Sequence, residues 1–264
     1  MPSPERHLDG MEPGPTPGAF ALKFCGLDED VQSAVGTRVI RMPTCVHLFA
    51  YRPLTLDAVA EFVGLPTARR VTEDADAVDA ELRGRGWSWE NDLVCDSLRT
   101  RYGHVLCSDE LSPFGHPDAR NFLVFGELYP LDPQDEHMTN EAWLRGHMDD
   151  WCQLPGWESR EACTDKDCET VLAQAAQAVT EYLGTEPERT LLSSAAVVTG
   201  PDLSHRIWRT STHALVLGPA ADNGPYGYLT HLQLSCTPLS CGPALPTADD
   251  EDALADWITA HVDW

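Results

Sequence analysis

Short apolar segments bounded by turn residues are the feature that most limits the folds open to this chain. Three such segments follow one another in each half, at 93–98, 102–107 and 121–129 and again at 189–198, 205–217 and 226–236. Their length and alternating or continuous apolar pattern indicate β-strands. Strands in runs with short connections pair antiparallel, whereas parallel pairs need long crossovers. The sequence therefore predicts an α+β fold with a mainly antiparallel sheet and flanking helices.

Helix signals lie on both sides of these strands. The clearest is Thr164 with Asp167 three residues later, which resembles a capping box, and Gly184 ends the apolar periodicity that follows. By the same capping and periodicity rules we expect helices at 55–63, 73–83, 140–152, 164–183 and 249–262, and two further short strands at 38–42 and 45–51.

The chain length suits one large domain or two smaller ones. The preferred division is a flexible Pro-rich leader at 1–20, an N-terminal α+β domain at 21–155 and a C-terminal α+β domain at 156–264. Both 73–152 and 164–262 can be interpreted as similar helix–three-strand–helix units. An internal duplication is therefore a hypothesis, although no residue pattern visibly repeats.

The charge balance limits the partners. With 42 Asp and Glu against 18 Lys and Arg, the formal net charge is −24. Such a chain repels nucleic acid and anionic lipid and attracts basic partners, an attraction that salt weakens. We expect a basic protein partner and no direct nucleic acid binding. The alternative is that the acidity only keeps the protein soluble and monomeric.

Other features bear on the compartment. The chain has no run of 18 apolar residues, which excludes a membrane-spanning helix, and its N-terminus lacks a signal-peptide pattern. Nine cysteines, an odd number, favour reduced thiols over a disulfide framework. The expectation is a cytoplasmic protein, and the preference for arginine over lysine is typical of a GC-rich bacterial genome.

Common catalytic motifs are absent from the sequence: a P-loop, a dinucleotide-binding glycine pattern, a nucleophile elbow and H-E-x-x-H. The best metal candidates are two C-x₄-C pairs, Cys163 with Cys168 and Cys236 with Cys241. A structural zinc takes four such ligands in a tetrahedron. The alternative is that these thiols are packing residues, and no cofactor is then needed.

Tryptophan and acidic residues supply the candidates for partner binding. Trp87 and Trp89 alternate around Ser88, which would place both indoles on one face of a strand. Exposed tryptophans beside acidic segments form hot spots for a basic protein, although most tryptophans belong to the core. The acidic candidates are Asp149 and Asp150, in a predicted helix, and Asp249, Asp250, Glu251 and Asp252, which can also be the acidic start of a helix.

Three classes of function remain. The first is a non-catalytic binding protein that neutralises or regulates a basic partner, as an immunity protein, antitoxin or inhibitor does. It ranks first because an acidic body can occupy a groove that otherwise holds phosphates. The second is an enzyme of unrecognised family, with or without a metal, and the third is a structural or assembly component.

Overall fold

One antiparallel sheet organises the described part of the chain. The computed structural model describes residues 46–131, 142–194, 201–221, 229–247 and 249–263, all within the unit Met42–Trp264. These residues form ten strands in a single sheet, five α-helices and one short 3₁₀ helix. Every strand pairing among them is antiparallel. The predicted α+β class with a mainly antiparallel sheet is confirmed.

The elements have the following bounds. The strands are β1 (Val46–Tyr51), β2 (Ser88–Glu90), β3 (Ser97–Arg99), β4 (Val105–Ser108), β5 (Asn121–Leu131), β6 (Glu158–Thr164), β7 (Arg189–Ser194), β8 (Asp202–Arg209), β9 (His213–Ala221) and β10 (Thr230–Pro238). The helices are α1 (Leu56–Val63), η1 (Leu65–Thr67), α2 (Ala75–Arg85), α4 (Ala142–Gln153), α5 (Asp165–Leu183) and α6 (Glu251–Val262).

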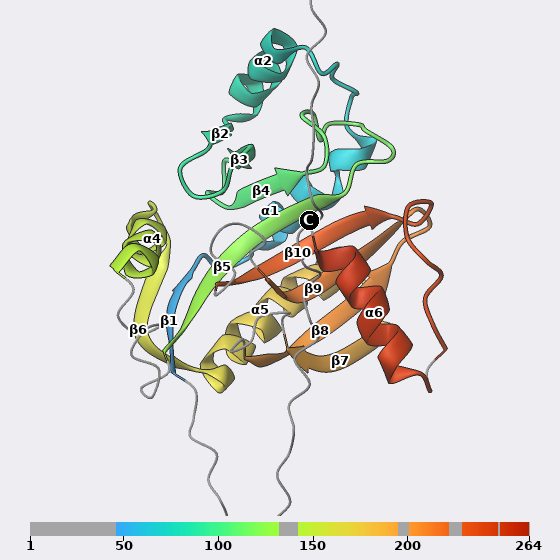
Figure 1. Cartoon of the computed structure of the whole chain (residues 1–264). Helices are drawn as coiled ribbons and strands as arrows, with labels where there is room; N and C mark the ends of the chain where they lie inside the picture. Colours follow the sequence, from blue (N-terminus) through green and yellow to red (C-terminus); the bar gives the residue numbers. More distant parts are fainter. Residues whose placement is uncertain (1–45, 132–141, 195–200, 222–228, 248, 264) are drawn as a thin grey trace, which may run out of the picture. The chain divides into compact units, whose positions relative to one another are not determined.

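The sheet branches at β5, the longest strand (Figure 1). One edge of β5 pairs with β10, while the other edge is shared by β4, at Asn121–Val124, and β1, at Gly126–Leu131. The order β2-β3-β4-β5-β10-β9-β8-β7 therefore carries a second branch, β1 and then β6. Between the two branches, Phe125 is an extra residue relative to β10, a bulge that bends the strand.

Helices cover both faces of the sheet, as the side chains of β9 show. Leu215 and Leu217 enter the large core that contains the buried residues of α1 and α5. Ala214 and Val216 point to the other face and pack with α6. A further core joins α4 to β1, β4 and β5. Successive strand residues alternate between faces, so both layers of helices are needed to cover this sheet.

The local helix signals are confirmed. Thr55 accepts a hydrogen bond from the backbone N–H of Ala58 at 3.3 Å and begins α1. Thr164 and Asp167 form the predicted capping box, and Gly184 ends α5 in the left-handed conformation at φ 70°. These signals act between residues three or four apart, which is why the sequence alone shows them.

Two strand predictions were wrong in extent. The single strand expected at 205–217 is two strands, β8 and β9, because Thr210 Oγ1 accepts hydrogen bonds from the backbone N–H groups of Thr212 (3.3 Å) and His213 (2.9 Å) and forms a turn. The segment expected as a strand at 93–98 contains β3 only at its end. Strand β6 was not predicted. The predicted strand at 38–42 and the leader lie outside the described residues.

The predicted division between residues 155 and 156 falls in the connection from α4 to β6. Strands from both sides of it pair within the sheet, β1 with β6 and β5 with β10. The described part gives no evidence of repeated units, because its strands belong to one branched sheet. None of the helices described is long and apolar enough to cross a membrane.

Gly115 provides a test of the packing in the connection from β4 to β5. Its φ is +64°, and a Cβ atom there would lie 2.4 Å from the carbonyl oxygen of Ala68. We expect Gly115→Ala to lower the free energy of unfolding by about 2 kcal/mol or more, since strain and a backbone clash combine. Urea denaturation measures the change.

Gly84→Ala is the matched control. Gly84 lies in α2, and a Cβ atom there meets no other atom within 4 Å. This variant should be neutral or more stable by up to about 1 kcal/mol, because alanine is the better helix former. Equal effects of the two substitutions would contradict the packing described for Gly115.

Candidate functional site

Of the two adjacent tryptophans predicted to share a face, only one reaches the surface. Trp87 is 4% exposed and packs against Phe114, with ring centroids 5.4 Å apart. Trp89 is 36% exposed on β2, and its indole N–H donates to Asp79 at 2.6 Å. Trp87 precedes β2 and is held under α2, where its backbone N–H donates to Leu82. Only Trp89 therefore remains as a surface candidate from this pair.

The outer face of α4 combines an exposed tryptophan with the predicted acidic pair. Asp149 and Asp150 are exposed, and Trp143 is 45% exposed. Trp143 lies in line with Asp150, because residues seven apart align along a helix, whereas Asp149 points about 120° further round. The opposite face buries Leu144, His147, Met148 and Trp151. From the sequence, the spacing of Trp143 with Leu144, His147, Met148 and Trp151 predicts that all five lie on one apolar stripe, but the structure leaves Trp143 exposed.

Strand β6 lies next to α4 and adds further acids. It pairs only with β1 among the described strands, and its residues from Glu158 to Ala162 are exposed. Burial raises the pKa of the Cys152 thiol in α4, and the charges of Asp149 and Glu161 raise it further. Asp149 of the helix and Glu161 of the strand therefore both lie near enough to Cys152 to raise its pKa.

We call this region the α4–β6 surface, defined by Trp143, Asp149, Asp150 and Glu161. On the face of the sheet away from α4, the Tyr51 hydroxyl of β1 donates to Glu158 and accepts a hydrogen bond from Arg160 at 2.5 Å, which fixes β6 against β1. The sequence-based search found Asp149 and Asp150 but missed β6. The charged residues of β6 form only a weak strand pattern in the sequence. The strand is recognised from its pairing with β1 in the structure.

The second predicted acidic group lies at the start of α6. Asp249, Asp250, Glu251 and Asp252 are all exposed. Asp250 is the N-cap, and its carboxylate accepts a hydrogen bond from the backbone N–H of Ala253 at 3.0 Å. Negative charge at a helix N-terminus is stabilising in itself. The structure therefore supplies a structural reason for this group.

The four cysteines considered for zinc are not brought together. Cys163 and Cys168 are fully buried, Cys236 is 1% exposed, and Cys241 lies at the surface. No three of these four sulfur atoms lie within 4.8 Å of one another. Burial raises the pKa of the Cys236 thiol to about 12, which keeps it protonated and apolar in character.

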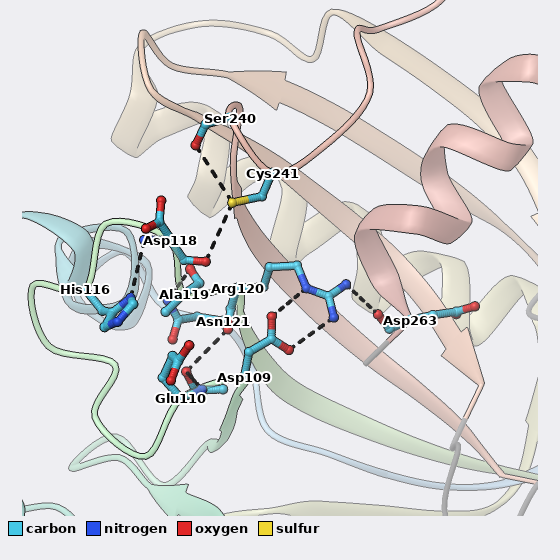
Figure 2. A network of polar contacts seen from close by, with 11 residues as sticks. Asp109, Glu110, His116, Asp118, Ala119, Arg120, Asn121, Ser240, Cys241 and Asp263 are labelled. Atoms are coloured by element: carbon cyan, nitrogen blue, oxygen red, sulfur yellow. Dashed lines mark hydrogen bonds and ion pairs between the residues drawn. The ribbon is translucent and has the colours of Figure 1, made fainter. Parts of the chain in front are cut away.

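One group of metal-type ligands is present among the described residues. Single ligand atoms of Glu73, Glu110 and His116 lie within 4.8 Å of one another, on loops around α2 and between β4 and β5. His116 Nδ1 accepts a hydrogen bond from the backbone N–H of Asp118 at 3.3 Å (Figure 2). Three partly exposed ligands are fewer than the four of a closed structural zinc site, and we assign no metal to them.

The same loop is anchored by Arg120, as Figure 2 shows. Its guanidinium donates to both carboxylate oxygens of Asp109, at 2.6 and 3.1 Å, and to the carbonyl oxygen of Asp263 at 3.0 Å. Cys241 Sγ lies 3.7 Å from the carbonyl oxygen of Asp118. Arg120 thus joins the loop after β4 to the end of α6, and Cys241 joins the same loop to the segment that follows β10.

A buried, hydrogen-bonded pair of ionisable residues lies at the centre of the sheet and was missed by sequence reasoning. Glu127 of β5 and His231 of β10 are partners in the strand register, 0% and 1% exposed, and their side chains bond to each other. On the same face of β10, Gln233, Ser235 and Thr237 are also buried. In the sequence of β10 these polar residues alternate with leucine, a pattern that indicates one polar strand face. Such a face normally lies against solvent, so the pattern predicts exposure where the structure has burial.

Comparison with protein-family models, with curated proteins and with solved structures found no match to this chain. Function is therefore inferred from the geometry of the described residues. Among the sequence-predicted candidates, Asp149 and Asp150 lie on the helix that also exposes Trp143, and this helix directly precedes β6, which pairs only with β1 among the described strands.

Two buried histidines make a pH dependence of stability testable. Burial lowers the pKa of His104 and of His205 from 6.5 to about 4, and the charge of Arg52 adds to the effect at His104. The unfolded chain binds these protons at a higher pH than the folded chain does. The stabilisation is thus complete above pH 6.5 and is lost as pH falls toward 4.

We expect His104→Gln to flatten this dependence. Between about pH 7.5 and 5.5 the wild type should lose about 1 kcal/mol more stability than the variant does. Denaturant unfolding at both pH values gives the difference. Gly84→Ala, which alters no ionisable group, is the control and should keep the wild-type slope; an unchanged slope in His104→Gln would contradict the assignment.

Proposed function

We propose that this chain is a non-catalytic binding protein that engages a basic protein through the α4–β6 surface. The observation that carries the proposal is that α4 exposes Trp143, at 45%, together with Asp149 and Asp150, with Asp150 in line with Trp143 two helical turns further on. Large exposed aromatic side chains are enriched among the residues that dominate binding energy. Acids around such an anchor select partners of opposite charge.

The edge of β6 supports the same interpretation. An edge strand presents backbone N–H and C=O groups that another chain can pair with. Glu158 and Glu161 on this strand are exposed, so a strand carrying lysine or arginine would be favoured over an acidic one. Backbone pairing would supply affinity, and the charges would supply specificity.

The net charge of −24 extends the attraction beyond this surface. It accelerates encounter with a basic protein and opposes binding to nucleic acid. A protein whose basic groove binds phosphates is the fitting partner, and occupying that groove would neutralise or regulate it. The proposal includes a cytoplasmic setting and the role of an immunity protein, antitoxin or inhibitor.

The partner can be isolated with the tagged full-length chain from the cells that encode it, at about 50 and about 500 mM NaCl, and then purified. We expect one basic protein in a stoichiometric complex at low salt, with affinity at least about tenfold weaker at high salt. Calorimetry with the purified partner should show a further loss of about tenfold for Asp149→Asn/Asp150→Asn and for Trp143→Ala.

Asp249→Asn/Asp252→Asn is the matched control, because it removes the same charge at another exposed acidic group. It should retain most of the affinity. If it weakens binding as much as the α4 variants do, the overall charge and not the α4–β6 surface governs binding. A partner that is acidic, or whose affinity does not depend on salt, contradicts the proposal.

A further inference from the structure

A pocket rich in arginine is present on this strongly acidic chain. Its volume is about 240 Å³, and Arg52, Arg99 and Arg101 line it together with the hydroxyl-bearing Ser88 and Thr100. Its lining includes no aspartate or glutamate. The local charge of this pocket is therefore opposite to that of the chain as a whole.

Segments far apart in the sequence converge on this pocket. Arg52 directly follows β1, Arg99 ends β3, and Arg101 lies in the turn from β3 to β4. Leu154 and Pro155, from the connection between α4 and β6, form an apolar wall. The pocket therefore exists only where both branches of the sheet meet.

The guanidinium of Arg52 is held in place by two glycine loops. Its Nη1 donates to the carbonyl oxygen of Pro155 at 2.7 Å. A Cβ atom at Gly156 would lie 1.9 Å from that Nη1, and one at Gly103 would lie 2.9 Å from the Arg52 Cζ. Both glycines have positive φ, +79° and +80°. Only glycine leaves room for the arginine here, so its position is preorganised.

The three arginines differ in their ion pairs. Arg99 pairs with the buried Glu90, and Arg101 Nε lies 3.0 Å from Glu61 Oε1. Arg52 has no carboxylate within 4.0 Å among the residues that the structure describes. Its charge is felt nearby, because it contributes to the lowered pKa of the buried His104. A fixed, uncompensated guanidinium in a chain with 42 acidic residues calls for an anionic ligand.

We infer that this pocket binds the phosphate group of a small molecule. Guanidinium groups bind phosphate through paired, charge-assisted hydrogen bonds, and hydroxyls complete the shell of a tetrahedral anion. Thr100 Oγ1 accepts a hydrogen bond from the backbone N–H of His104 at 3.2 Å, which leaves its hydroxyl hydrogen available for donation.

The size and charge of the surroundings restrict the ligand. Pockets for drug-sized molecules span about 300–1,000 Å³, so a volume of about 240 Å³ fits a free phosphate ion or a small phosphorylated metabolite. The acidic body repels an extended polyanion such as nucleic acid, whereas a small anion can enter a locally positive pocket. This site is separate from the α4–β6 surface in residues and in charge.

Calorimetric titration at constant ionic strength tests the inference, with inorganic phosphate, ribose 5-phosphate and adenosine monophosphate as probes. We expect saturable binding of at least one of them with Kd of about 1 mM or below. Binding of the inorganic ion alone assigns free phosphate, and tighter binding of an ester assigns a metabolite. Arg52→Gln should weaken binding by about tenfold or more. Gly103→Ala should weaken it as well, because its methyl group displaces the guanidinium.

Arg209→Gln is the charge-matched control. Arg209 is exposed and pairs with Glu188 outside the pocket, so this variant should bind as the wild type does. Circular dichroism and thermal melts confirm that each variant is folded. The inference is overturned if no phosphate probe binds saturably, if citrate binds more tightly than all of them, or if Arg209→Gln loses as much affinity as Arg52→Gln.

Discussion

The hydrogen bonding of β5 along both edges is the constraint on which the rest of this structure depends. One edge holds β10, and the other holds β4 and β1 in succession, with the Phe125 bulge at the point of change. The backbone N–H of Arg52 donates to the Phe125 carbonyl oxygen at 2.8 Å, so the chain leaves β1 at this bulge. The buried Glu127–His231 pair adds a side-chain link between β5 and β10. A change of register would separate the two side chains and leave both buried without a partner. Because that is costly, the pair favours the observed register of β5 and β10.

Because the sheet branches, two surfaces of opposite charge meet at one connection. The loop from α4 to β6 follows the acidic helix face and precedes the acidic edge strand, while its Pro155 carbonyl oxygen holds Arg52 in the basic pocket. Charge on this chain is therefore organised locally and is not uniform. The acidic surface suits a protein partner and the pocket suits a small anion, since only a small ligand escapes the repulsion of the whole body.

The sequence-based predictions mostly succeeded where the interacting residues are close together in the sequence, and mostly failed where they are far apart. The helices after Thr55 and Thr164 were predicted well, because their caps join residues three apart. The break at Thr210 was missed, because a threonine turn inside a β-branched run resembles continued strand. Asp149 and Asp150 were identified as surface acids, but Trp143 was placed on the buried stripe of the same helix. The basic pocket was not anticipated, since Arg52, Arg99 and Arg101 are ordinary isolated arginines in the sequence.

The sequence by itself determined the α+β class, the helix ends and the strongly acidic character, because these follow from composition and from contacts within one turn of chain. The tertiary structure alone decided that strands from both halves form one branched sheet, that the polar face of β10 is buried, and that Arg52 has no acidic partner among the described residues. Those properties arise from pairings across 100 residues or more, such as Tyr51 with Glu158. No local pattern encodes such a pairing, because its energy depends on which distant strand edge is available.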